Sequence, residues 1–499
     1  MDIVVKRASI LEESADLLLV DLYQGSGITG GATAAVDQAL KGALGRVLAS
    51  GDFAAKAGET LLLYSDPALR APRVLLVGLG LPEAYDASVA RNVAASAARR
   101  ARELGLKSLV SVVPGAATSL GPRKACQAFV EGMLLGLYRF AGHRSKRPEN
   151  WRPDPTTLTL VDLDAERAAT YPFAVARAEA IVKGVKLARD LVNEPANRMT
   201  PRIMAERATE MAVETGLRIE VLERADMEAL GMGILLAVAA GSVEPPRFIV
   251  LEHNAGRDDL PTLVLAGKGV TFDTGGISLK PRDDMWLMKD DMAGGAAVIG
   301  ALGVAARLNL PVHVVGLVPL AENMPAGQAN KPSDVYRGMS GKTMEVISSD
   351  AEGRMLLADT LAYADRFNPT AVVDIATLTG AQEIAFGPQA AALFCNDDAL
   401  AASLAEAAEA SGERLWRMPL YAEYAEAIKS QVADVKNSGG RTNGIGTSAK
   451  FLEFFTEGYP WAHIDMASMA WSEEDKPARP KGATGYGVRL LATLLEYWR

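Results

Sequence analysis

Short apolar runs without an alternating polar residue are the feature that most constrains this sequence. Such runs are typical of strands in a parallel sheet covered by helices on both faces, because neither face then meets water. In the C-terminal part, we expect strands at 247–253, 262–267, 312–320 and 371–378, with helices at 294–308 and 355–366. This pattern predicts an α/β/α arrangement with a mostly parallel central sheet. Sites in such folds lie beyond the carboxyl ends of the strands.

The N-terminal part predicts a smaller α/β domain, and 499 residues are too many for one core. Its expected strands are 15–22, 60–66, 73–80 and 108–115, with an Ala- and Arg-rich helix near 88–104. A polar, Pro-rich stretch at 141–158 precedes a long helical pattern from about Tyr171 to Leu191. We therefore expect an N-terminal α/β domain over 1–165, a linking helix over 166–192 and a larger domain over 193–499.

The composition favours a cytoplasmic protein that binds neither membranes nor nucleic acid. The 52 Lys and Arg residues against 61 Asp and Glu give a net charge of -9, which repels polyanions. Cys126 and Cys395 form no CxxC or metal-ligand pattern, as expected in a reducing compartment. The N-terminus lacks the features of a signal peptide, and no run reaches the roughly 18 apolar residues of a membrane span.

Several common catalytic signatures are absent from the sequence. The four histidines form no HExxH motif, and no GxSxG motif or cysteine signature supplies a nucleophile. The segment RGMSGKT (337–343) has Tyr336 where a phosphate-binding loop needs its first glycine, and no clear strand precedes it. We therefore favour structural roles for the histidines and no nucleotide site at 337–343.

Acidic residues instead gather in three segments of the larger domain. Lys268 and Asp273 lie in GKGVTFDTGGISLKP (267–281), directly after an expected strand. Asp290 and Asp291 precede a helix of small residues, a position that taken alone favours an N-cap role for a carboxylate. Asp350, Glu352 and Arg354 alternate in SSDAEGRMLLAD (348–359), and on an extended segment alternate residues point the same way.

These segments supply hard oxygen donors and one amine, a set that suits two divalent cations. Such a pair polarises a carbonyl and lowers the pKa of a shared water. Lys268 can ligate only as the neutral amine and is otherwise an ion-pair partner. On composition and spacing alone, a structural network of salt bridges explains the cluster equally well.

The sequence resembles the leucyl aminopeptidase family of two-metal exopeptidases over roughly 193–499. The resemblance is carried by NEPANRMTP (193–201), GKGVTFDTGGISLKP, MKDDMAGGAA (288–297), DAEGR (350–354), DIATLTGA (374–381) and WAHIDMA (461–467), in the family's order. It makes the larger domain the catalytic metallopeptidase domain. It also implies removal of leucine and other N-terminal residues from peptides, in peptide catabolism.

The resemblance further implies roles for individual residues. Asp273 and Glu352 would bridge the metals, Lys268 and Asp291 would complete one site, and Asp350 the other. Lys280 would polarise the scissile carbonyl, and Arg354 would hold a bicarbonate ion that acts as general base. The pocket for the N-terminal side chain would be formed by Met288, Thr377, Gly380 and Ala467. The family also implies a homohexamer and two divalent ions per subunit, Mn²⁺ or Zn²⁺, while the donor set itself also fits magnesium or cobalt.

Two positions depart from the family's pattern. Ser348 and Ser349 stand where Asn-Thr is common, and Ser468 replaces a frequent glycine. We expect altered hydrogen bonds around the ligands or an altered pocket shape. A DNA-binding or regulatory assembly and a phosphoester hydrolase remain alternatives. The acidic net charge disfavours the former, and the absence of a phosphate cradle disfavours the latter.

Overall fold

The computed structural model describes residues 1–65, 69–257, 259–456 and 458–498. The chain forms two compact units, Met1–Val182 with Glu474–Lys481, and Lys183–Glu473 with Gly482–Arg499. The division falls within the long helix α5 (Ala165–Asn193). Residue 66 of the expected strand 60–66 lies outside the described residues. No helix among the described residues combines the length and apolarity needed to cross a membrane.

The first unit is an α/β domain whose described sheet has the order β1-β6-β5-β2-β4-β3. Its strands are β1 (Asp2–Lys6), β2 (Leu17–Leu22), β3 (Thr60–Tyr64), β4 (Arg73–Gly78), β5 (Ser108–Ser111) and β6 (Thr157–Val161). Its helices are α1 (Gly31–Ala39), α2 (Ala43–Ser50), η1 (Pro82–Ala84), α3 (Ala87–Glu103) and α4 (Pro122–Gly136). All pairs are parallel except β3 with β4. β5 ends before the expected 115 because Pro114 lacks an amide donor and Gly115 has a positive φ.

The second unit is built on a larger sheet of order β16-β15-β18-β14-β9-β11-β8-β7, with β10 paired to β11. Its strands are β7 (Arg218–Leu222), β8 (Arg247–His253), β9 (Thr262–Gly267), β10 (Gly269–Asp273), β11 (His313–Asn323), β14 (Ala371–Ala376), β15 (Ala391–Cys395), β16 (Leu415–Arg417) and β18 (Trp461–Asp465). The central strands β18, β14, β9, β11 and β10 are parallel, and antiparallel pairs flank them. The predicted fold class, with a smaller N-terminal and a larger C-terminal α/β domain, is therefore confirmed.

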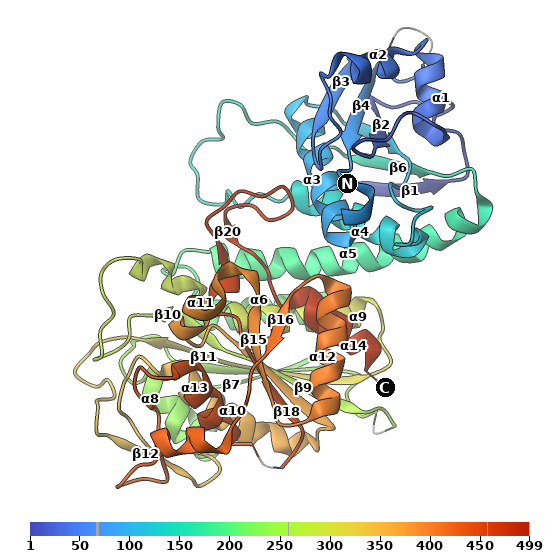
Figure 1. The fold of residues 1–499 in the computed structure, drawn as a ribbon. Coiled ribbons are helices and arrows are strands. Elements are labelled where there is room, and N and C mark those ends of the chain that lie inside the picture. Colours follow the sequence, from blue (N-terminus) through green and yellow to red (C-terminus); the bar gives the residue numbers. More distant parts are fainter. Residues whose placement is uncertain (66–68, 258, 457, 499) are drawn as a thin grey trace. The chain divides into compact units, whose positions relative to one another are not determined.

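Helices cover both faces of this sheet (Figure 1). One face carries α6 (Pro201–Thr215), α9 (Ala293–Arg307), α12 (Asp398–Ser411) and α14 (Val488–Tyr497). The other carries α8 (Gly233–Ala239), α10 (Glu352–Ala364) and α13 (Gly444–Glu453). The remaining helices of the unit are α7 (Arg224–Ala229), η2 (Met285–Asp290), η3 (Asp365–Phe367), α11 (Gly380–Phe386), η4 (Gly387–Gln389), η5 (Ala422–Ile428) and η6 (Ala467–Met469). Two covered faces explain why β9 and β14 read as unbroken apolar runs.

Short strands complete the unit away from the main sheet. They are β12 (Val335–Arg337), β13 (Thr343–Glu345), β17 (Val435–Lys436), β19 (Trp471–Ser472) and β20 (Gly482–Ala483). β12 precedes the segment 337–343, contrary to the expectation that no strand stands there. However, β12 pairs antiparallel with β13, so the segment is a hairpin connection and opens no helix. A phosphate-binding loop needs that following helix.

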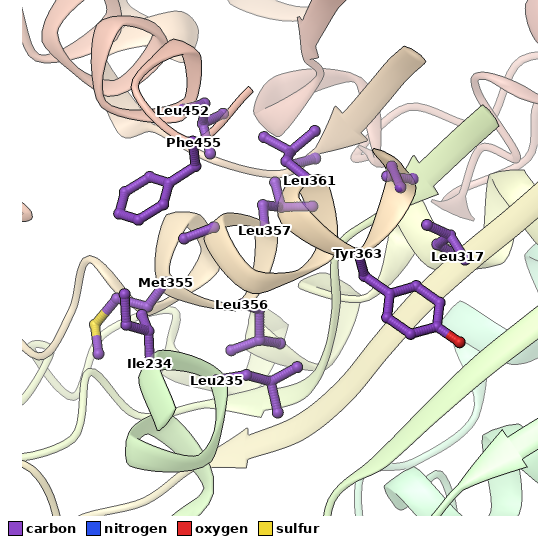
Figure 2. Packing of buried hydrophobic residues seen from close by; sticks show 14 of the residues in the cluster. Ile234, Leu235, Leu317, Met355, Leu356, Leu357, Leu361, Tyr363, Leu452 and Phe455 are labelled. Carbon is purple, nitrogen blue, oxygen red and sulfur yellow. The ribbon is translucent and has the colours of Figure 1, made fainter. Parts of the chain in front are cut away.

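The core of this unit centres on α10, in which every residue is buried. Figure 2 shows its side chains packed among residues of α8, α13 and the sheet. Leu357 and Leu361 lie on the side of Leu452 of α13, whereas Leu356 points toward Leu235 of α8. A helix that is buried on all sides is held rigidly by its neighbours. The first turn of α10 therefore offers a fixed platform for polar side chains.

Candidate metal centre

Five predicted ligands meet at the carboxyl ends of the parallel strands. Lys268 follows β9, Asp273 ends β10, and Asp291 follows η2. Asp350 lies in the turn before α10, and Glu352 is the first residue of that helix. Parallel strands end at the same sheet edge, so residues far apart in sequence are brought together.

Glu352 and Arg354 lie on a helix, so the expectation of an extended segment with alternating side chains at 350–354 was wrong. α10 begins at Glu352, three residues earlier than the sequence pattern predicts. The polar residues before Met355 hid this start, because they interrupt the apolar pattern on which helix prediction relies. The structure nevertheless brings one oxygen each of Asp273, Asp350 and Glu352 within 4.8 Å of one another.

Neither Asp290 nor Asp291 caps α9, which overturns the alternative drawn from the sequence. The N-cap residue is Met292, and no side chain makes the capping hydrogen bond. Asp291 instead accepts hydrogen bonds from Lys268 Nζ at 2.7 Å and Thr377 Oγ1 at 2.8 Å, both through Oδ1. Its Oδ2 is buried and has no hydrogen-bond partner among the described residues.

Two lysines hold the carboxylates together. Lys268 Nζ lies 2.7 Å from Asp291 Oδ1 and 2.8 Å from Glu352 Oε1, and it donates to the backbone oxygen of Thr377 at 2.8 Å. Lys280 Nζ lies 2.8 Å from Asp273 Oδ2 and 2.6 Å from Asp350 Oδ1. Each ammonium therefore joins two acidic side chains from different segments.

Burial makes this concentration of negative charge unfavourable without cations. Burial, followed by the charge of Glu352, raises the pKa of Asp273 to about 6, although both lysines oppose the shift. Burial also raises the pKa of Asp291 well above its usual value. Burial lowers the pKa of Lys268, but Asp291 and Glu352 raise it by more, so its net pKa lies above the usual value. Lys268 is thus an ammonium ion here, and it becomes a neutral ligand only if other cations displace its proton.

The donor set fits divalent cations. Lys268, Asp273 and Glu352 are each only 2% exposed and Asp291 is also buried, whereas Asp350 lies at the exposed side of the group. Hard oxygen donors with buried negative charge are what Mn²⁺, Mg²⁺ and Zn²⁺ sites provide. The unpartnered Oδ2 of Asp291 leaves a further donor available. No histidine belongs to the carboxylate group found among the described residues.

A layer of polar residues orients these ligands, and sequence reasoning missed one of them, Asn323. Asn323, at the end of β11, donates from Nδ2 to Asp273 Oδ1 at 2.8 Å and to the backbone oxygen of Ser349 at 3.0 Å. Ser349 Oγ donates to the backbone oxygen of Gly275 at 2.7 Å and accepts from the amide of Ser278 at 2.7 Å. Ser349, one of the positions that depart from the family's pattern, therefore connects the segments that carry Asp273 and Asp350.

The second departure, Ser468, also makes specific contacts. Its amide donates to Gln382 Oε1 at 2.8 Å, and its hydroxyl donates to the backbone oxygen of Gly387. These bonds connect η6 to α11 and η4. A glycine has no hydroxyl, so a relative with glycine at this position would lack the bond to Gly387.

Arg354 is buried near the carboxylates, but not all of its hydrogen-bond donors have a partner among the described residues. Its Nη1 donates to the backbone oxygen of Asn437 at 2.8 Å, and its Nε has no partner among the described residues. Burial lowers the pKa of Arg354 to about 10, opposed by Glu352 and Asp465. The guanidinium therefore stays charged at neutral pH and has a free donor for an anion.

Of the expected pocket residues, Thr377 contacts a predicted ligand, because its Oγ1 donates to Asp291 Oδ1 at 2.8 Å. Thr377 follows β14, Gly380 opens α11, Ala467 opens η6, and Met288 lies on η2. Asp465 holds two of these segments together. Its Oδ1 accepts from the amides of Leu378 at 3.2 Å and Ala467 at 3.3 Å, and its Oδ2 accepts from Thr379 Oγ1 at 2.7 Å.

His463 illustrates the structural role that the sequence favoured for histidines. It is buried in β18, where its Nδ1 pairs with Asp374 of the neighbouring strand β14. Trp461 Nε1 donates to the other oxygen of that carboxylate at 2.7 Å. The pair is part of the sheet and lies outside the carboxylate group.

The chain matches two family descriptions that together cover most of its length. Residues 186–492 match the catalytic domain of the cytosol aminopeptidase family, and residues 19–147 match its N-terminal domain. A probable cytosol aminopeptidase of Roseiflexus castenholzii is 47% identical over 100% of this chain and 99% of its own. One of Syntrophotalea carbinolica is 47% identical over 99% of this chain and 100% of its own.

Solved structures show the same likeness. A variant of tomato leucine aminopeptidase superposes with a TM-score of 0.88 at 32% identity, covering 99% of this chain and 96% of its own. The bottromycin maturation enzyme BotP in complex with Mn superposes with a TM-score of 0.85 at 38% identity, covering 97% and 99%. The resemblance read from the sequence is thereby confirmed. The chain belongs to the cytosol aminopeptidase family and is a peptide-bond hydrolase of the aminopeptidase type.

Proposed function

We propose that this aminopeptidase uses two divalent ions to remove leucine and other residues from peptide N-termini. The observation that carries the proposal is the convergence of Asp273, Asp291, Asp350 and Glu352 around two lysine ammonium groups. Asp273 and Glu352 would bridge the ions, Lys268 and Asp291 would complete one site, and Asp350 the other. Mn²⁺ is favoured because the similar BotP structure is a complex with Mn, and Zn²⁺ is the other candidate.

Bound ions would supply Lewis-acid polarisation of the scissile carbonyl and an activated water near neutral pH. The chain's own residues would do the rest. Lys280, whose side chain is 22% exposed, would be released from Asp273 and Asp350 when cations replace its charge. Its ammonium would then donate to the oxyanion that develops at the substrate carbonyl.

Arg354 would hold bicarbonate as the general base. The support is its free Nε and its buried, permanently charged guanidinium, which suit a small planar anion. A base held at this position would accept a proton from the attacking water. Met288, Thr377, Gly380 and Ala467 would surround the N-terminal side chain of the peptide.

The test is release of leucine from leucyl amide by protein stripped with a chelator and resupplied with Mn²⁺ or Zn²⁺. We expect restored activity in the wild type and none in Asp273→Ala. The matched control is Asp283→Ala, an exposed carboxylate on the segment before η2, which should keep its activity. Folded, metal-loaded wild-type protein without activity would overturn the proposal.

Two further proposals rest on the family alone. We propose a homohexamer, which light scattering after size-exclusion chromatography would test by mass, and a mass of one or two subunits would contradict it. We also propose a cytoplasmic location. The relatives' name, cytosol aminopeptidase, supports it. We expect the protein to cofractionate with cytoplasmic enzymes when cells are separated, and recovery with the membranes or medium would contradict this.

A further inference from the structure

The chain leaves two neighbouring strands of the first unit in opposite directions. After β2 it passes through α1 and α2 to β3 and β4, on one side of β2 in the sheet. After β5 it passes through α4 to β6, on the other side, and β5 and β2 are parallel neighbours. Open α/β sheets bind their ligands at such a reversal, beyond the carboxyl ends of the two strands. The topology therefore singles out the ends of β2 and β5.

A pocket lies at these strand ends, under α3 and α4. Its polar side chains come from the two strands, and apolar side chains of β4 and the two helices form its wall. The lining includes Asp21 of β2, Ser111 of β5, Pro114, Val77 of β4, Val93 of α3 and Phe129 of α4. A mostly apolar pocket with a few polar groups is the usual form of a small-molecule site.

Two polar groups at the end of β2 lack partners within the described part of the chain. No other residue there donates a hydrogen bond to the Asp21 carboxylate or forms an ion pair with it, and burial raises its pKa to about 6. The hydroxyl of Tyr23 is buried and has no hydrogen-bond partner. The Tyr23 ring packs edge-on against Tyr85, with 5.4 Å between the ring centroids, and Tyr85 Oη lies 3.4 Å from the backbone oxygen of Pro114. Buried polar groups are normally hydrogen-bonded, so a polar ligand here would satisfy groups that the chain leaves unpaired.

A glycine-rich loop joins β2 to α1. The segment GSGITG (25–30) has the spacing G-x-G-x-x-G, which binds phosphate when it follows a strand and opens a helix of a parallel crossover. β2 precedes this loop, α1 follows it, and β2 pairs in parallel with β4. α1 has nine residues, no side-chain hydrogen bond at its N-cap and no acidic residue in its first turn. Its first amides therefore receive no acceptor from a capping side chain and can donate to an anion.

The fold itself does not require two of these glycines. Gly25 has a φ of 77°, which disfavours a side chain. Gly27 and Gly30 lie outside the left-handed region, and a Cβ at either position would meet no atom of the described chain within 4 Å. Backbone strain and crowding therefore do not explain them. Close approach of a phosphate does, because it requires a bare backbone.

We propose that the first unit binds a nucleoside diphosphate, with its phosphates at the N-terminus of α1 and its nucleoside in the pocket beside Asp21. Amides of the glycine loop and of the first turn of α1 would donate to the phosphates. Hydroxyls of the sugar or an amino group of the base would donate to the Asp21 carboxylate, and Val93 and Phe129 would contact apolar atoms of the nucleoside. In the dinucleotide fingerprint an acidic residue after the second strand holds the sugar. β4 ends in Val77 and Gly78, so Asp21 would take that part here.

The test is calorimetric titration of the full-length protein with ADP, and separately with adenosine and with inorganic pyrophosphate. We expect one ADP per chain, and affinities lower by about tenfold or more for the two fragments, because each makes only part of the contacts. Gly27→Val should weaken the binding of ADP and pyrophosphate by about tenfold or more, because its side chain fills the space that the phosphate needs. Asp21→Asn should weaken the binding of ADP and adenosine by about tenfold without weakening that of pyrophosphate.

Gly142→Val is the matched control. Gly142 also belongs to the first unit, lies outside the left-handed region and has open space around its Cβ among the described residues. This variant should bind ADP as the wild type does. Without ADP, Gly27→Val should unfold at the wild-type temperature, because its Cβ meets no neighbouring atom. Asp21→Asn, which has almost the same shape as the wild type, keeps the test decisive if the valine variant fails to fold.

Three results would overturn the inference. The first is wild-type protein that binds no ADP at millimolar concentration. The second is unchanged ADP affinity in both Gly27→Val and Asp21→Asn, which would place the nucleotide elsewhere on the chain. The third is pyrophosphate that binds as tightly as ADP, because the pocket beside Asp21 would then contribute nothing.

Discussion

Gly353→Ala should favour the helix α10 but disturb the metal centre. Gly353 lies in the first turn of α10, between Glu352 and Arg354. A Cβ there would lie 2.5 Å from Lys268 Cε and 2.7 Å from Lys268 Nζ. Ordinary contacts between such atoms are roughly 3.5 Å or longer, so the lysine must move by about 1 Å. That shift would stretch its bonds to Asp291 and Glu352 beyond hydrogen-bonding distance.

The two energetic effects of this substitution have opposite signs. Alanine is favoured over glycine within a helix by about 1 kcal/mol. Losing one partner of a buried ion pair costs about 3–5 kcal/mol. The free energy of unfolding of the metal-free protein should therefore fall by about 2–4 kcal/mol, since the second effect is larger. Mn²⁺ affinity should fall by about tenfold to a hundredfold or more, because a ligand is displaced.

Urea unfolding and calorimetric titration with Mn²⁺ measure the two quantities. Gly444→Ala is the matched control, because its Cβ meets only Ala381 Cβ at an ordinary 3.8 Å. That variant should bind Mn²⁺ as the wild type does, and its free energy of unfolding should equal that of the wild type or exceed it by up to about 1 kcal/mol. A Gly353→Ala protein with wild-type stability and wild-type Mn²⁺ affinity would refute the reasoning, since it would show that Lys268 is not confined by α10.

Three other substitutions test the packing and electrostatics of the two units. Burial raises the pKa of Asp21 from 3.8 to about 6, so wild-type stability should decline as pH rises from about 4 to about 6. Asp21→Asn should be more stable than wild type above pH 6 by about 1–3 kcal/mol in urea unfolding and equal to it near pH 4; no pH dependence of the difference would contradict this. Asp359→Ala should lower the free energy of unfolding by about 2–4 kcal/mol, because the amides of Leu235 and Met339 then lack their buried acceptor. A decrease below about 1 kcal/mol would argue against this role of Asp359. Leu357→Ala should lower the free energy of unfolding by about 2–5 kcal/mol, because it leaves a cavity in the core shown in Figure 2. An unchanged thermal unfolding temperature would show that neighbouring side chains move to fill the cavity.

The sequence predicted the long buried strands well because burial on both faces leaves a strong apolar signal. β8 and β9 have the expected bounds of 247–253 and 262–267. The short strands β12, β17 and β20 were not predicted, because two or three residues carry no periodicity. The start of α10 was placed too late, since its first turn is polar.

Part of the site could also be predicted from the sequence, because it follows the apolar strands. Charged residues that directly follow apolar strands, such as Lys268, can be expected at one edge of a parallel sheet. Asn323 and Asn437 were missed because their roles come from contacts across long sequence separations. Asn323 bonds to Asp273, and Asn437 accepts from the amides of Ile347 and Ser348. Nothing local distinguishes these asparagines from surface ones.

The number of metal ions bound per chain distinguishes a two-metal centre from a network of salt bridges. Protein stripped with a chelator, reloaded with Mn²⁺ and desalted would be analysed by native mass spectrometry and elemental analysis. We expect two ions per wild-type chain. Glu352→Ala should lose both, because that carboxylate would serve both ions and also pairs with Lys268. One ion or none in the wild type, or two ions retained by Glu352→Ala, would contradict the two-metal account.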